Sequence, residues 1–146
     1  MTTTSTPRTA QVGDEIPPFE RFADFPAWNR YAAVNDEFVP IHMDDDAGRN
    51  AGMSSAIGMG NLGVSHIHCM LRDWLDGQGR ITGVAIQFRS PSLRSRTNTT
   101  HGKVVDVSPA DVSGDGRRRL GLEVWIDDGD GTVLTRGTAT VEVDAP

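Results

Sequence analysis

Hydrophobic and polar residues alternate along much of the second half of the chain, which is the pattern of β-strands with one buried face. The alternation is found in four segments: 81–88, 97–107, 120–126 and 133–143. The Asp- and Gly-rich segment 127–131, between the last two of these, has the composition of a hairpin turn. The polar segment 111–119 has the same character. The sequence therefore predicts a four-stranded antiparallel meander.

A helical pattern precedes these strands. Across residues 61–76, apolar side chains recur around most of the helix cylinder, which is typical of a buried central helix. A shorter helix is expected to begin with Asp24 as its N-cap and to end near Asn35, because Pro26 suits the first turn of a helix. Another short helix is expected over residues 44–52, where acidic residues at the N-terminus suit the helix dipole.

The segment 14–22 contains two adjacent prolines and therefore predicts an edge strand. The order of an edge strand, helices, a long helix and four strands predicts an α+β fold in which one sheet wraps a long helix. A length of 146 residues fits one domain. We expect the Thr-rich residues 1–11 to be a disordered tail and residues 12–146 to form the single domain.

Composition narrows the classes of partner and location. The net charge of −6 argues against nucleic acid as a partner. No apolar run approaches the roughly 20 residues of a membrane span, and the first residues lack the apolar core of a signal peptide. The single cysteine, Cys69, allows no internal disulfide and suits a reducing cytoplasm. We expect its side chain to be small and buried on the long helix.

The candidate catalytic residues are Asp36, Glu37 and His42. A Phe-Val-Pro-Ile stretch separates the two adjacent carboxylates from the histidine. Pro40 fixes its own φ and favours an extended Val39. A short rigid turn would then aim one carboxylate and His42 into one pocket. A carboxylate beside an imidazole suits acid/base work on a water molecule or a carbon acid. The alternative is a helix end followed by a solvated polar loop.

A glycine-bearing turn, Ile57-Gly58-Met59-Gly60-Asn61, leads into the long helix. The first N–H groups of a helix have no intrahelical partner and lie at the positive end of its dipole. Pointed at a carbonyl oxygen, they form an oxyanion hole. Gly60 and Asn61 are therefore candidates for substrate binding. The alternative is that the glycines only allow close packing of the helix, and both interpretations can hold.

We expect no metal site. His66 and His68 are two residues apart, which places them about 200° apart around a helix, so they cannot chelate one ion. His42 and the three aspartates at 44–46 offer metal-binding residue types. Helix capping and solvation explain those aspartates more simply.

The residues around His42 resemble the motif of the MaoC-like, or R-specific enoyl-CoA hydratase, family, whose members have the hot-dog fold. That motif reads approximately Gly-Asp-x-Asn-Pro-[Ile/Leu]-His-x-Asp, and residues 38–44 match its second part. The turn at 57–61 stands where the family has a helix-opening His-Gly-Met. Residues 87–91 resemble its Phe-[Lys/Arg]-x-Pro strand end, and residues 137–141 resemble its last strand. The similarity extends over about residues 12–143.

The resemblance implies reversible addition of water across the double bond of a 2-enoyl thioester carried by CoA or a carrier protein. Position by position, the family's catalytic aspartate falls on Glu37, its catalytic histidine on His42 and its oxyanion-hole glycine on Gly60. Asp36 takes the role of the acid if the turn is shifted. The resemblance implies no cofactor.

The chain departs from the family pattern around Ser95 and Arg96, where the family commonly has Gly-Asp after the strand end, and at three residues near the motif. Glu37 is one methylene longer than the usual aspartate, Val39 replaces the usual asparagine, and Met59 replaces the usual histidine of the helix-opening turn. This form of the motif is similar to an actinobacterial subgroup, in which some relatives act on bulky acyl-CoAs or form one chain of a mixed assembly. The alternative function is therefore a weak or inactive hot-dog subunit that binds acyl-CoA or completes the site of a partner.

Arg89, Arg94 and Arg96 follow the first of the four strands. They either meet CoA phosphates at the mouth of a pocket or are solvated loop residues, and Arg89 is the candidate for substrate binding. We expect a dimer, because a hot-dog sheet leaves an edge and the family usually forms its pocket at an interface. The partner is either a second copy or a different hot-dog chain.

Overall fold

The computed structural model describes residues 5–109 and 114–146 and contains two 3-10 turns, three α-helices and five strands within them. In chain order the elements are η1 (Pro7–Thr9), β1 (Glu15–Ala23), α1 (Phe25–Asn35), η2 (Pro40–His42), α2 (Asp45–Asn50), α3 (Gly60–Leu75), β2 (Gly79–Phe88), β3 (Arg96–Pro109), β4 (Arg118–Asp127) and β5 (Val133–Val143). The predicted helices and strands all form, within a few residues of their expected ends. Part of the predicted polar loop at 111–119 lies outside the described residues.

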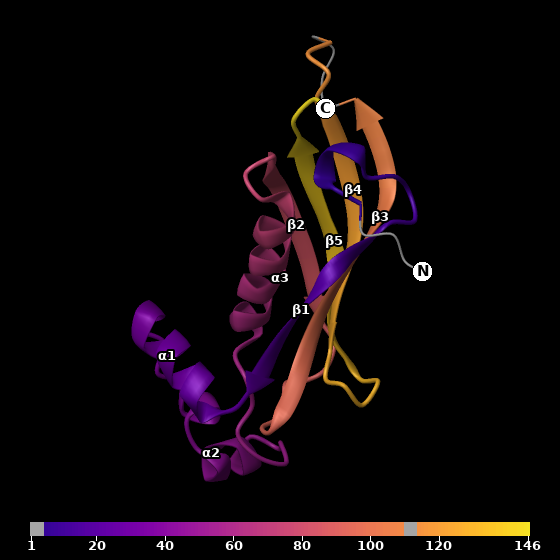
Figure 1. Cartoon of the computed structure of the whole chain (residues 1–146). Helices are drawn as coiled ribbons and strands as arrows, with labels where there is room; N and C mark the ends of the chain where they lie inside the picture. The colour runs from indigo at the N-terminus through magenta and orange to yellow at the C-terminus, as the bar shows by residue number, and fades with distance from the viewer. Residues whose placement is uncertain (1–4, 110–113) are drawn as a thin grey trace.

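The five strands form one antiparallel sheet with the order β1-β3-β4-β5-β2. The long helix α3 runs along one face of this sheet, as Figure 1 shows. This arrangement confirms the predicted α+β hot-dog architecture. The edge position predicted for the first strand is also confirmed, because β1 pairs only with β3.

The predicted four-stranded meander is wrong in one strand. β3, β4 and β5 form a meander, but β2 pairs with β5 instead of β3. The chain between β2 and β3 does not close a hairpin, because it bonds to the segment before α3. The Gly58 N–H donates to the Ser92 carbonyl at 2.8 Å, and Ile57 forms a bridge with Leu93. Strand alternation predicts the faces of a strand but not its neighbours.

One face of α3 supplies much of the core. Its buried side chains pack against inward residues of β4 and β5, and the cluster includes Ile67, Met70, Leu71, Trp74, Leu75, Leu120, Leu122, Val124, Ile126, Val141 and Val143. The opposite face of the helix is open, so the expectation of a buried Cys69 is wrong: this side chain is exposed. A single sheet covers only one side of a helix. Within the described part of the chain, no helix is long and apolar enough to cross a membrane.

Residues 5–11 are not a disordered tail, which corrects that part of the expectation for residues 1–11. Ala10 is fully buried. The Trp74 indole donates to the Ser5 carbonyl at 3.2 Å, and the Arg118 guanidinium donates to the carbonyls of residues 7, 8 and 10. Side-chain donors on α3 and β4 therefore form hydrogen bonds with backbone carbonyls of this segment, which does not pair with a strand. Residues 1–4 lie outside the described part of the chain.

Replacing Arg118 by Ala is expected to lower the free energy of unfolding by about 1–3 kcal/mol, because several carbonyls lose their donor. Urea denaturation measures the change. Arg80→Ala is the control, since Arg80 is 67% exposed in its ion pair with Glu142 and surface pairs contribute about 1 kcal/mol or less. An equal loss in the two variants would contradict the anchoring role of Arg118.

A second, smaller cluster forms where the chain leaves β1 and before it enters α3. Its buried members are Ala23, Trp28, Ala32, Ala56 and Met59. In Figure 1, α1 and α2 project beyond the sheet near the start of α3. We call residues 24–59 the overhanging segment. It carries both the predicted acid and the predicted histidine.

Candidate active site

The two candidate carboxylates, Asp36 and Glu37, follow directly after the end of α1. Asp36 adopts the left-handed conformation, with φ 53° and ψ 42°, and closes the helix. The Glu37 N–H bonds back to the Ala32 carbonyl at 3.0 Å. Val39 is extended and Pro40 opens the turn η2, which ends at His42. The short rigid turn predicted from Pro40 therefore forms.

One cavity of about 460 Å³ brings together most of the candidate residues. Glu37 and His42 reach it from the overhanging segment, and Gly60 and Asn61 from the start of α3. Arg89 reaches it from the position directly after β2. Asp36 does not line this cavity in the described structure. The left-handed turn that sends Glu37 towards the cavity sends the preceding side chain elsewhere, which favours Glu37 as the acid.

The His42 ring is held by a backbone carbonyl. Its Nδ1 lies 2.7 Å from the carbonyl oxygen of Ile57. A carbonyl oxygen only accepts, so Nδ1 carries the proton and donates. In the neutral ring Nε2 is then an acceptor, ready to take a proton from a bound molecule.

The start of α3 presents backbone N–H groups at the wall of the cavity. Met59 is the N-cap residue and its side chain makes no capping hydrogen bond. The Leu62 N–H bonds to the Met59 carbonyl at 3.2 Å, whereas helix geometry gives the first N–H groups no such partner. Gly60 is also needed for space, because a Cβ there would lie 2.6 Å from the Phe88 ring.

His66 lines the same cavity, a placement that the sequence did not indicate. Its ring lies 5.8 Å from the Phe19 ring, centroid to centroid. Burial, and secondarily the nearby charge of Arg21, lowers the pKa of His66 to about 4. His66 is therefore neutral at pH 7. The one available signal is its spacing from Leu62, one helical turn earlier, which also faces the cavity.

The lowered pKa of His66 predicts a loss of stability in acid. Between pH 6.5 and pH 4 the unfolded chain binds the proton more readily than the folded chain, so the free energy of unfolding falls as the pH falls. From pH 7 to pH 5 the loss due to this group is about 2 kcal/mol at most. His66→Gln should lose less stability than the wild type over the same interval, as urea denaturation at the two pH values would show. Parallel losses would contradict this assignment.

Two of the three arginines considered for CoA phosphates are engaged within the chain. Arg94 donates to Asp24 and to Asp45, at 2.8 Å in each case. Arg96 forms an ion pair with Asp130. Arg94 and Arg96 are therefore neither solvated loop residues nor free to bind a phosphate. Arg89 remains the candidate, because it lines the cavity.

The aspartates at 44–46 have structural partners. The Asp44 carboxylate accepts from the Asp46 N–H at 2.9 Å and caps α2, as the sequence predicts. Asp46 pairs with Arg49 at 2.7 Å. Among the described residues, no group of three or more His, Cys, Asp or Glu side chains is placed to hold a metal ion.

No protein-family model matches this sequence, and no curated protein does. Solved structures do resemble it. The (R)-hydratase from A. caviae involved in PHA biosynthesis is 19% identical, with a TM-score of 0.79 over 95% of this chain and 99% of that one. The MaoC-like dehydratase from Rhodospirillum rubrum is 18% identical, with a TM-score of 0.78 over 97% and 98%.

A chain of the HadBC (3R-hydroxyacyl-ACP dehydratase) complex from Mycobacterium tuberculosis also resembles this protein, with 12% identity and a TM-score of 0.73. The match covers 92% of this chain and 98% of the HadBC chain. The likeness in all three extends over nearly the whole length of both chains. The protein therefore has the hot-dog fold of the (R)-hydratases and MaoC-like dehydratases.

Proposed function

We propose that this protein is a MaoC-like hydratase or dehydratase, which adds water to, or removes it from, a 2-enoyl thioester. The observation that carries the proposal is the single cavity shared by Glu37, His42 and the first residues of α3. The hot-dog fold of the (R)-hydratase and dehydratase structures supports it.

The reaction needs two proton transfers. In our proposal Glu37 and His42 hold one water molecule between them, with His42 accepting through Nε2. One of the two groups takes a proton from the water as its oxygen bonds to Cβ. The other group, which carries a proton at the start, gives it to Cα. A proton then passes from the first group to the second, so that the elements of water have added across the double bond and the pair is restored. The reverse sequence removes water.

The thioester carbonyl gains negative charge when oxygen adds at Cβ. We place this carbonyl at the start of α3, where the Gly60 N–H donates to the developing enolate oxygen, with Asn61 beside it. The positive end of the helix dipole favours the same charge. Met59 in place of a histidine does not remove the backbone donor.

The substrate that we propose is an acyl-CoA or acyl-carrier thioester. The acyl chain fits the apolar side chains that line the cavity, among them Met53, Met59 and Leu134. Arg89 is the group that we propose for a carrier phosphate. The site uses no cofactor or metal in this scheme. The cytoplasmic location remains a prediction from the sequence.

We also propose that the protein acts as a dimer. β1 and β2 are the two outer strands of the sheet, and pairing with another chain would satisfy their free edges. The HadBC structure is a complex, which supports the second candidate function, a hot-dog subunit that binds acyl-CoA or completes a partner's site. The mass of the complex, measured for the chain alone and after co-expression with a second hot-dog chain, distinguishes a homodimer from a mixed dimer.

The experiment that tests the proposed function supplies crotonyl-CoA and a bulky enoyl-CoA in water labelled with heavy oxygen. A hydratase gives 3-hydroxyacyl-CoA that carries the heavy oxygen and leaves the thioester intact. Release of free CoA would instead show thioester hydrolysis and contradict the proposal. Binding of acyl-CoA without any product would favour the partner-subunit function.

A further inference from the structure

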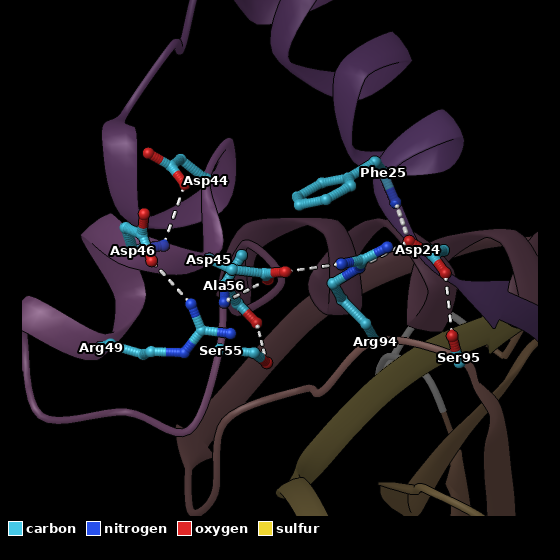
Figure 2. Close-up of polar contacts among 10 residues, drawn as sticks. All are labelled: Asp24, Phe25, Asp44, Asp45, Asp46, Arg49, Ser55, Ala56, Arg94 and Ser95. Atoms are coloured by element: carbon cyan, nitrogen blue, oxygen red, sulfur yellow. Dashed lines mark hydrogen bonds and ion pairs between the residues drawn. The ribbon is translucent and has the colours of Figure 1, made fainter.

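Arg94 links two parts of the overhanging segment that are distant in sequence. Its Nε donates to Asp24 Oδ1 and its Nη1 donates to Asp45 Oδ2, at 2.8 Å in both cases. The guanidinium also lies over the Phe25 ring, 4.0 Å from its centroid. Figure 2 shows Arg94 between the two carboxylates, which belong to the start of α1 and the start of α2. We call Asp24, Arg94 and Asp45 the arginine clamp.

The arginine clamp extends towards His42 through a short run of hydrogen bonds. The second oxygen of Asp45 accepts from the Ala56 N–H at 3.0 Å. The next residue, Ile57, donates its N–H to the Ile41 carbonyl at 3.0 Å. The Ile57 carbonyl then accepts from His42 Nδ1 at 2.7 Å. Asp45 thus holds the backbone that decides the tautomer and orientation of His42.

We infer that Arg94 and Asp45 are positioning residues, which fix the His42 ring through Ala56 and Ile57. This inference rests on the proposed function only in its effect on rate. Its effect on the His42 ring is independent of any reaction. Neither residue lines the cavity, so neither is expected to touch the substrate.

The positive charge of Arg94 is needed to hold Asp24 and Asp45 close together. Asp24 and Asp45 both direct an oxygen at the same guanidinium, so its removal leaves two carboxylates facing one gap. The Arg94 hydrogen bond is the largest cause of the lowered pKa of Asp24, but the Phe25 N–H and the Ser95 hydroxyl also lower this pKa and remain without Arg94. The Asp24 carboxylate therefore stays charged at neutral pH in the variant and would repel Asp45. Like charges at this range push their elements apart. α2 would shift, and the Ala56–Ile57 backbone would shift with it.

The same helix offers a matched control. Arg49 pairs with Asp46 at 2.7 Å on the outer side of α2, where the two side chains are 56% and 82% exposed. In Figure 2 this pair lies on the other side of Asp45 and Ala56 from Arg94. It is also an arginine–aspartate pair in the overhanging segment, but within the described part of the chain its hydrogen bond leads only from Arg49 to Asp46 and not to the Ile57 carbonyl.

The test compares Arg94→Gln, Asp45→Asn and the control Arg49→Gln with the wild type. Long-range proton–nitrogen NMR of the histidine rings reports the His42 tautomer. We expect the wild type and Arg49→Gln to carry the proton on Nδ1. The two clamp variants should show a mixture that includes the Nε2-protonated form. Arg94→Lys should recover part of the wild-type pattern, because an ammonium keeps the positive charge but lacks the planar set of donors of a guanidinium.

The rate readout follows the same variants with an enoyl-CoA substrate. We expect kcat to fall roughly 10- to 100-fold in the clamp variants, with a smaller change in KM, because a displaced group costs rate more than affinity. Arg49→Gln should change kcat by less than about 2-fold, since surface pairs contribute little. Circular dichroism confirms that each variant is folded.

An unchanged His42 tautomer in both folded clamp variants would overturn the inference, as would a kcat equal to that of Arg49→Gln. If the wild type hydrates no enoyl thioester, the proposed function fails, and the NMR comparison alone decides the positioning role. A tautomer that changes only in the clamp variants supports the inference in either case.

Discussion

Glu37→Gln is expected to lower kcat for enoyl-CoA hydration by roughly 10²- to 10⁴-fold, the usual contribution of a general acid or base. The amide keeps the shape of the side chain but can neither take nor give the proton. Since Glu37 lines the cavity with His42, the loss should appear in kcat more than in KM. Steady-state kinetics over a range of substrate concentrations measures both.

Asp36→Asn is the matched control for this change, because it removes the same charge from the neighbouring position. Asp36 has a left-handed conformation, which asparagine tolerates as well as aspartate, so the helix end should persist. We expect Asp36→Asn to retain activity within a few-fold of the wild type. If Asp36→Asn lost activity and Glu37→Gln kept it, the assignment of the acid to Glu37 would be wrong.

His42→Ala is expected to lower kcat by a similar factor, roughly 10²- to 10⁴-fold. The change removes the Nε2 acceptor and also the hydrogen bond to the Ile57 carbonyl. His101→Ala serves as the control, since His101 pairs with Asp127 and stacks on Trp125 in the sheet. Near-wild-type turnover by His42→Ala, or an equal loss in His101→Ala, would count against a catalytic His42.

Much of the fold could be predicted because its signals are local. Asp24 caps α1 through its own side chain, and Asp36 ends that helix directly before the acid Glu37. Pro40 sets the turn before His42 within three residues of it. These features need no information from the rest of the chain.

The features that the sequence did not predict depend on distant residues. The anchoring of residues 5–11 uses donors from Trp74 and Arg118, which lie far along the chain. The pairing of β2 with β5 is likewise non-local. Periodicity reports which side of an element is apolar, and it does not report which element will cover that side.

The candidate site divides in the same way. The spacing of the two carboxylates from His42 indicated an acid–histidine pair, and the resemblance of residues 38–44 to the family motif placed the acid on Glu37. The cavity contains both Glu37 and His42. The arginine clamp gave no sequence signal, because Arg94 meets Asp24 across 70 positions and Asp45 across 49. The only sequence signal for His66 was its helical spacing from Leu62. Three arginines after a strand look alike in sequence, and only their partners distinguish Arg94 and Arg96 from Arg89.

The central claim is that Glu37 and His42 act on one water molecule as a unit. Its most direct measurement is the rate of loss of enoyl absorbance with the wild type, Glu37→Gln, His42→Ala and the double variant. Residues that act together are strongly non-additive, so the double variant should be little slower than the slower single variant. Losses that multiply, or single variants that keep wild-type rates, would contradict the claim.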